Sequence, residues 1–156
     1  MPDLSPKKFR NSFVRIDGQL FHSKWEAEYW LALQLAEADG LIDRLRRQVA
    51  YQLIVNAANL GKAIIDFSFI EVSKGGYGKQ LRLQDCKGYV RKGVPATSLW
   101  KLKYGIIQAN SGIPVEIITR PRKKDLLTTE DQTFQGRLFS YLKKIDMDKI
   151  KPNKGT

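Results

Sequence analysis

Three charged residues are spaced so that they could act together on a phosphodiester bond. Asp66 interrupts the apolar stretch Ile-Ile-Asp-Phe-Ser-Phe-Ile, and Asp85 and Lys87 stand two positions apart further along the chain. Residues two apart in a strand share one face, so Asp85 and Lys87 are expected to point to the same side. If the two strands form a hairpin centred between Gly75 and Gly76, Asp66 and Asp85 lie directly opposite each other.

Two carboxylates roughly 5 Å apart repel each other by about 3 kcal/mol at an effective dielectric constant of about 20. A divalent cation between Asp66 and Asp85 removes this repulsion, and Mg²⁺ commonly takes one or two carboxylates with water and phosphate oxygens. Lys87 could orient or deprotonate a water, or stabilise charge on the phosphate. This set suits metal-dependent phosphodiester hydrolysis. The alternative is an Asp85–Lys87 ion pair, with Asp66 merely a polar residue of its strand.

The overall charge favours a polyanionic partner. The chain has 156 residues with 27 Lys and Arg against 16 Asp and Glu, a net charge of +11. Such an excess sets the phosphate affinity of nucleic-acid-binding proteins, so DNA is the expected partner. No apolar run approaches the roughly 20 residues of a membrane span, and no membrane partner is expected. The residues expected to contact phosphates are Lys24, Arg91, Lys92, Lys101 and Lys103.

The rarity of cysteine and histidine excludes several kinds of site. Cys86 is the single cysteine and His22 the single histidine, which rules out an intramolecular disulfide and a multi-cysteine zinc site. A Ser–His–Asp triad is also disfavoured. The first residues carry no apolar segment typical of a secretory signal, so the sequence predicts a protein of the reducing cytoplasm.

The hydrophobic pattern predicts an α/β domain with one small sheet flanked by helices. Asp17-Gly18 indicates a hairpin turn, and Gly40 is a natural helix stop. The elements follow the order helix, strand, strand, strand, helix, strand. The expected ranges are a hairpin over 13–21, helices over 23–38 and from 97 or 98 to about 109, and strands over 49–55, 62–71, 80–87 and 115–119.

The segments outside this core are expected to be less regular. Residues 1–12 are polar and basic and predict a flexible arm, and residues 13–119 form the core. Residues 120–128 are expected to form a basic linker. An amphipathic helical segment follows over about 130–144, and the polar tail after Ile145 is expected to be mobile.

A set of residues spread over about 10–119 resembles a family of small phage and prophage proteins. Members of that family are predicted nucleases of the PD-(D/E)XK superfamily, which includes phage endonuclease I-type Holliday-junction resolvases. The matching positions are Asp17-Gly18, Phe21, Ser23-Lys24, Glu26-Ala27, Tyr29, Leu31, Leu35, Gly40, Ile42, Gln48, Asp66-Phe67-Ser68, Asp85-x-Lys87-Gly88 and Leu99-x-x-Leu102-Lys103.

The resemblance implies a restriction-endonuclease-like αβββαβ core with a mixed sheet, here with a C-terminal helical extension. It also implies an Mg²⁺-dependent DNA endonuclease, with Mn²⁺ able to substitute. Asp66 and Asp85 match the motif acids and Lys87 the motif lysine. The backbone carbonyl of Cys86 is implied as an extra metal ligand, and Glu26 matches a helix glutamate that completes such sites. Ser23-x-x-Glu26 is also a helix capping box, which leaves a structural role for Glu26 open.

The resemblance further implies a substrate, an assembly and a host. Branched DNA, such as a four-way junction, is the expected substrate. Symmetric cutting of a junction needs two active sites, so a homodimer is expected. The host compartment is the bacterial cytoplasm, with a phage or prophage origin. Two alternatives stay open: a DNA-binding module without catalysis, and a sequence-specific or end-processing nuclease of a mobile element.

Overall fold

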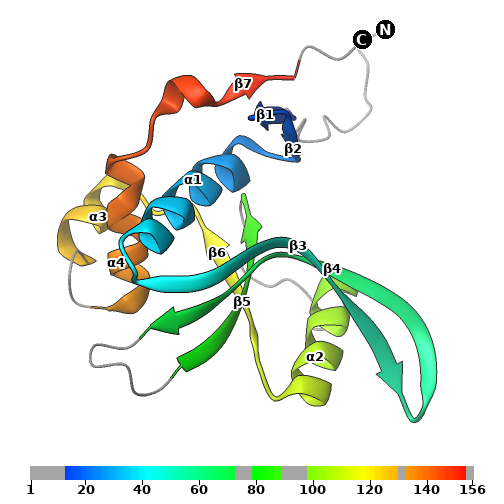
Figure 1. The fold of residues 1–156 in the computed structure, drawn as a ribbon. Helices are drawn as coiled ribbons and strands as arrows, with labels where there is room; N and C mark the ends of the chain where they lie inside the picture. Colours follow the sequence, from blue (N-terminus) through cyan, green and yellow to red (C-terminus); the bar gives the residue numbers. More distant parts are fainter. Residues whose placement is uncertain (1–12, 73–78, 89–97, 130–132, 154–156) are drawn as a thin grey trace, which may run out of the picture.

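The structure, a computed structural model, describes residues 13–72, 79–88, 98–129 and 133–153. It contains a four-stranded sheet and a separate three-stranded sheet, with helices packed against them (Figure 1). From the first long helix to the last strand of the large sheet, the order is helix, three strands, helix, strand. The predicted α/β class and this order are confirmed. The bounds are α1 (Lys24–Ala38), β3 (Ile42–Val55), β4 (Ala58–Val72), β5 (Lys79–Lys87), α2 (Leu99–Ser111) and β6 (Val115–Thr119).

The large sheet is mixed. β3 pairs with β4 and β4 with β5 in antiparallel fashion, whereas β5 and β6 run parallel. The β4–β5 partners run from Phe67–Gln84 to Val72–Lys79, which is the register predicted for a hairpin between Gly75 and Gly76. Because β4 starts at Ala58, its first half pairs with β3 alone and the two strands project together beyond β5 (Figure 1).

The helices cover opposite faces of this sheet. Phe67 and Phe69 of β4 are fully buried against α1, which contributes Tyr29 and Leu33 to the same cluster. On the other face, a second cluster joins residues of β3, β4 and β5 to Ile107 of α2. Helix α1 ends at Ala38, and the predicted stop residue Gly40 follows two positions later, where its positive φ of 80° allows the N–H of Leu41 to bond back to the Ala36 carbonyl.

Strand β3 begins seven residues earlier than the predicted start at Val49. The missed segment holds Asp43, Arg44, Arg46 and Arg47, residue types that rarely signal a strand. Pairing with β4 stabilises it, because the register continues down to Ile42–Glu71. The fold therefore overrides a local sequence preference at this edge of the sheet.

The small sheet joins the two ends of the described chain. It contains β1 (Val14–Ile16), β2 (Gln19–Phe21) and β7 (Lys151–Pro152), with β1 in the middle. The predicted hairpin turn at Asp17-Gly18 is confirmed, with positive φ at both residues. The prediction of a mobile tail is wrong over residues 146–153. A 3₁₀ turn, η2 (Met147–Lys149), leads into β7, and the Asn153 N–H donates to the carbonyl of Phe13 at 3.0 Å.

The basic linker predicted over 120–128 is also incorrect, since helix α3 (Lys123–Thr129) forms there. The Asp125 carboxylate accepts hydrogen bonds from both the backbone and the guanidinium of Arg122, and this contact organises the first turn. The amphipathic segment that follows divides into α4 (Phe134–Ser140) and a 3₁₀ turn, η1 (Tyr141–Lys143). The predicted C-terminal helical extension is therefore present.

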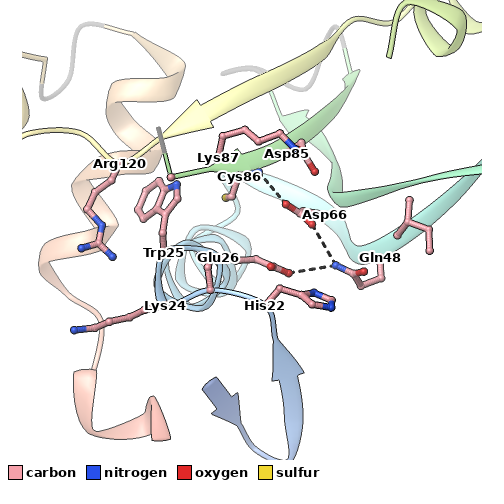
Figure 2. A pocket seen from close by; sticks show the side chains of 13 residues that line it. His22, Lys24, Trp25, Glu26, Gln48, Asp66, Asp85, Cys86, Lys87 and Arg120 are labelled. Atoms are coloured by element: carbon pink, nitrogen blue, oxygen red, sulfur yellow. Dashed lines mark hydrogen bonds and ion pairs between the residues drawn. The ribbon is translucent and has the colours of Figure 1, made fainter. Parts of the chain in front are cut away.

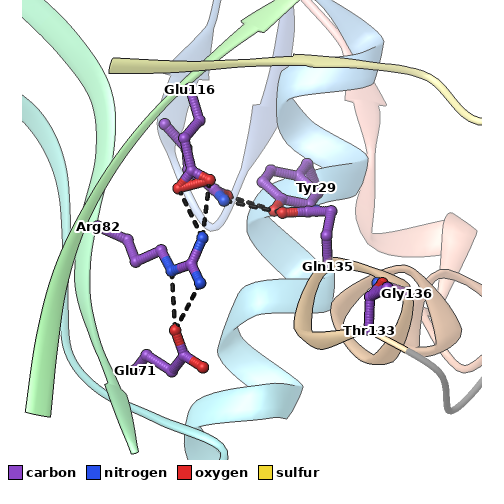
Figure 3. Close-up of polar contacts among 8 residues, drawn as sticks. Tyr29, Glu71, Arg82, Glu116, Thr133, Gln135 and Gly136 are labelled. Carbon is purple, nitrogen blue, oxygen red and sulfur yellow. Dashed lines mark hydrogen bonds and ion pairs between the residues drawn. The ribbon is translucent and has the colours of Figure 1, made fainter. Parts of the chain in front are cut away.

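Polar contacts attach this extension to the core (Figure 3). The Tyr29 hydroxyl donates to Gln84, Gln84 donates to Gln135 at 2.9 Å, and Gln135 donates back to the Tyr29 oxygen at 2.9 Å. Beside them, Arg82 bridges Glu71 and Glu116 at 2.7 and 3.0 Å. Because Tyr29, Gln84 and Gln135 come from α1, β5 and α4, the C-terminal segment belongs to the same packed unit.

Two predicted segments lie outside the described residues: the basic arm 1–12 and the hairpin turn about Gly75 and Gly76. The same holds for Arg91 and Lys92. Among the helices that the structure does describe, none has the length and apolar character needed to cross a bilayer.

Candidate functional site

A cavity of about 780 Å³ opens where the N-terminus of α1 meets the ends of β5 and β6 (Figure 2). It brings together six residues that the sequence analysis singled out. Four further charged or polar side chains line it. The predicted members are Lys24, Glu26, Asp66, Asp85, Cys86 and Lys87, and the others are His22, Ser23, Gln48 and Arg120.

Asp66 occupies the point where the β4–β5 ladder stops. The last paired residue is Phe67, so the next position in register places Asp66 opposite Asp85. Its Oδ2 accepts the Cys86 backbone N–H at 2.9 Å, and its Oδ1 accepts from Gln48 Nε2 at 3.3 Å. Both oxygens have partners, which holds the carboxylate in one orientation (Figure 2).

Asp85 and Lys87 face one side of β5, as predicted. Asp85 is only 3% exposed, and Lys87 Nζ lies 2.8 Å from its Oδ2. That oxygen still has no hydrogen bond of good geometry among the described residues. The Lys87 ammonium also lies 5.5 Å and 5.7 Å from the ring centroids of Trp100 and Tyr104. Helix α2 thus holds the lysine over the site.

Glu26 enters the cavity from the first turn of α1, 4% exposed. Ser23 caps the helix by accepting the Glu26 backbone N–H at 3.1 Å, as the capping box predicts. The Glu26 side chain points elsewhere: its Oε1 accepts from Gln48 Nε2 at 3.2 Å and lies 3.7 Å from the Arg47 guanidinium. The carboxylate is therefore oriented toward Asp66 and the cavity (Figure 2).

Asp66 and Glu26 share an environment that disfavours their charged forms. Burial, followed by the charges of Asp85 and Glu26, raises the pKa of Asp66 to about 8. Burial also raises the pKa of Glu26, against the opposing effects of His22 and Arg47. Burial also raises the pKa of the Cys86 thiol well above its usual range, which disfavours the nucleophilic thiolate form. The lining therefore sets three carboxyl groups, Glu26, Asp66 and Asp85, among the cations Lys24, Lys87 and Arg120.

The residues present fit a divalent cation of the Mg²⁺ type. The test is the donor set: Asp85 Oδ2 is buried, with the Lys87 ammonium at 2.8 Å but no well-aligned hydrogen bond, and it lies beside the Asp66 carboxylate. Within the described ranges, no three His, Cys, Asp or Glu side chains converge as metal ligands. Gln48 and Arg47 engage the Glu26 carboxylate, and Gln48 also engages Asp66. Two carboxylates suffice for Mg²⁺ when water and phosphate complete the shell.

Of the described residues predicted to contact phosphates, only Lys24 lines the cavity. Lys24 lies on its rim, with its side chain 55% exposed and 4.0 Å from Glu28. Lys101 and Lys103 lie on α2 and are not among the lining residues. Arg120, which follows β6, is a rim cation that the sequence analysis did not assign to the site. It pairs with Glu28 at 2.9 Å and lies over the Trp25 ring.

Sequence reasoning also missed Gln48 and the aromatic pair on α2. Gln48 enters the sequence analysis only through the family resemblance, and no motif connects Trp100 and Tyr104 with Lys87. No spacing rule links a residue of β3 to acids on α1 and β4. The one available signal was a polar amide within a strand-forming segment.

Comparison of the chain with family models, with curated proteins and with solved structures finds no significant match to any of them.

The raised pKa of Asp66 predicts how the metal-free protein responds to pH. Between about pH 4 and pH 8 the folded state keeps a proton that the unfolded chain has released, so stability falls as pH rises. We expect the melting temperature in EDTA to decrease from pH 5 to pH 8.5, and Asp66→Asn to flatten this decrease. The exposed Asp148→Asn is the control and should retain the wild-type profile. An unchanged profile for Asp66→Asn would contradict the assignment.

Proposed function

We propose that this protein is a divalent-metal-dependent nuclease that hydrolyses phosphodiester bonds in DNA. The observation that carries the proposal is the meeting of Asp66, Asp85 and Lys87 in one open cavity, with Asp85 Oδ2 buried and lacking a well-aligned hydrogen bond. A pair of close carboxylates, with Asp85 buried and Asp66 half-buried, is costly for a purely structural site. The αβββαβ order and the antiparallel–antiparallel–parallel sheet support the restriction-endonuclease-like core that the resemblance implies.

The chain's own residues have separable tasks in this reaction. Asp66 and Asp85 would hold the cation, and the Cys86 carbonyl between the Asp85 and Lys87 positions is the proposed additional ligand. When bound, an Mg²⁺ ion would supply Lewis-acid stabilisation of the phosphate and of an attacking water. Lys87 is positioned by Asp85 and two aromatic rings, so its ammonium can donate to a water or to a phosphate oxygen.

The rim of the cavity suits a nucleic-acid backbone. Lys24 and Arg120 both line it, and Figure 2 shows them on the side away from Gln48. Lys24 and Arg120 both form an ion pair with the carboxylate of Glu28, so these three side chains together carry a net positive charge. With a net charge of +11 on the chain, we propose that a DNA strand crosses the cavity over these two side chains.

Branched DNA cut by a homodimer is the finer form of the proposal. It depends on the family resemblance and on the requirement that symmetric cutting needs two copies of the site. A DNA-binding module without catalysis is the second candidate. The Asp85–Lys87 ion pair and the lack of a convergent three-acid set in the described ranges favour it.

The decisive experiment compares an end-labelled four-way junction with a matched linear duplex in Mg²⁺, Mn²⁺ and EDTA. We expect wild-type protein to cut only in the presence of metal, with paired symmetric cuts in the junction. Lys87→Ala should lose at least about a hundredfold in cleavage rate, the scale of removing one transition-state donor. Lys149→Ala, an exposed lysine outside the cavity, is the matched control and should cut normally.

Three other results of this experiment would each change the proposal. Equal cutting of both substrates would retain the nuclease and reject the junction preference. Binding of DNA without cleavage under any metal would reject the nuclease in favour of the binding module. Cleavage by Lys87→Ala at the wild-type rate would remove Lys87 from the mechanism.

A further inference from the structure

Gln48 has an unusual backbone conformation directly beside the acidic residues. Its φ is +55°, in the left-handed region that residues other than glycine, asparagine and aspartate seldom adopt. The neighbouring strand partners are Arg47–Phe67 and Val49–Ile65, so Gln48 lies opposite Asp66 in register. A strained residue inside a long strand requires a reason, and such residues are frequent at functional sites.

Along β4, the buried side chains change from the cluster packed under α1 to the cluster packed under α2 at this position. Phe67 and Phe69 are buried in the cluster under α1, whereas Ala63 and Ile65 belong to the cluster that contains Ile107 of α2. Simple alternation along β4 would place all four on one face. The change of cluster falls between Ile65 and Phe67, the two residues that flank Asp66, while the pairing register with β3 continues unbroken.

The Gln48 side chain bridges two acids that come from different elements. Its Nε2 atom donates to Glu26 Oε1 on α1 at 3.2 Å and to Asp66 Oδ1 on β4 at 3.3 Å. Figure 2 shows the resulting chain of contacts from Cys86 through Asp66 and Gln48 to Glu26. Gln48 thus sets the relative position of the helix carboxylate and the strand carboxylate.

An amide suits this position better than a cation would. An arginine or lysine between Glu26 and Asp66 would neutralise the carboxylates and compete with a metal ion for them. The carboxamide of Gln48 donates hydrogen bonds without a formal charge, so it does not neutralise the charge that Asp66 carries when ionised. Arg47, the adjacent cation, lies toward Glu26 rather than Asp66.

We propose that Gln48 is a positioning residue for metal capture. Its carboxamide holds Asp66 in the orientation in which Asp66 and Asp85 together take a divalent cation, and Glu26 is its anchor on α1. This inference depends on the proposed nuclease function. It adds a residue from β3 to a site otherwise built from α1, β4 and β5.

The test measures Mn²⁺ binding to metal-stripped protein through the rise of its melting temperature with Mn²⁺ concentration. We expect Gln48→Ala and Gln48→Gly to raise the half-saturating Mn²⁺ concentration roughly 10- to 100-fold, the usual effect of losing a group that orients a metal ligand. In EDTA, Gln48→Gly should melt no lower than Gln48→Ala, because glycine adopts a positive φ freely. Gln52→Ala, an exposed glutamine on the same strand, is the matched control.

The outcomes separate this inference from the proposed function. Asp85→Asn should abolish the stabilisation by Mn²⁺, which shows that the ion binds at the carboxylates. If Gln48→Gly then binds Mn²⁺ with wild-type affinity, the inference is overturned, whatever the stability of that variant. If wild-type protein shows no Mn²⁺ effect and Asp85→Asn behaves identically, the metal-dependent function fails and the inference fails with it. If Gln48→Ala does not fold, Gln48→Gly alone decides, since it removes both the side chain and the strain.

Discussion

Asp85→Asn is expected to reduce metal-dependent DNA cleavage by at least about a hundredfold while DNA binding is retained. Asparagine has nearly the shape of aspartate but lacks the charge that would hold a cation. Asp85 is 3% exposed, and its Oδ2 has no well-aligned hydrogen bond in the described part of the chain. The loss should match that of other residues that stabilise transition-state charge, about 10²–10³ in rate.

Binding should survive because the variant removes a negative charge near the DNA. The affinity measured by fluorescence anisotropy in EDTA is expected to equal or exceed that of wild-type protein. Asp148→Asn, on the exposed turn η2 outside the cavity, should change neither cleavage nor binding. Unaltered cleavage by Asp85→Asn would exclude Asp85 from the site, and parallel loss of binding and of the circular dichroism signal would indicate unfolding instead.

Leu138→Ala is expected to lower the free energy of unfolding by about 2–5 kcal/mol, as large cavities in packed cores do. Leu138 lies on α4 and is fully buried in the cluster that contains Trp25 and Tyr29 of α1. The C-terminal segment therefore supplies part of the main core. Urea unfolding monitored by tryptophan fluorescence measures the change.

The matched control is Leu60→Ala. Leu60 stands on the projecting half of β4 and is 63% exposed, so its removal should change stability by less than about 0.5 kcal/mol. Equal effects of the two substitutions would show that α4 is not part of the cooperative core. A large effect at Leu138 alone would confirm that residues beyond Thr119 support α1, and through it the position of Glu26.

Local sequence signals predicted much of the backbone. The Asp17-Gly18 turn, the stop of α1 at Gly40 and the strand ending at Thr119 each depend on nearby residues, and each is present in the structure. The register that places Asp66 opposite Asp85 followed from the symmetry of a hairpin about its glycine-rich turn. The errors concern segments stabilised by distant contacts: the first half of β3, helix α3 and strand β7.

The features of the candidate site also separate into those set by nearby residues and those set by contacts between distant elements. The placing of Asp66, Asp85 and Lys87 on one strand pair was predictable, because period-two geometry and turn position are local properties. Three other features come from the packing of distant elements: the Glu26 carboxylate turns to Gln48, Arg120 reaches the rim, and α2 places aromatic rings around Lys87. These contacts join elements far apart in the chain, and the packing of helices on the two faces of the sheet sets them.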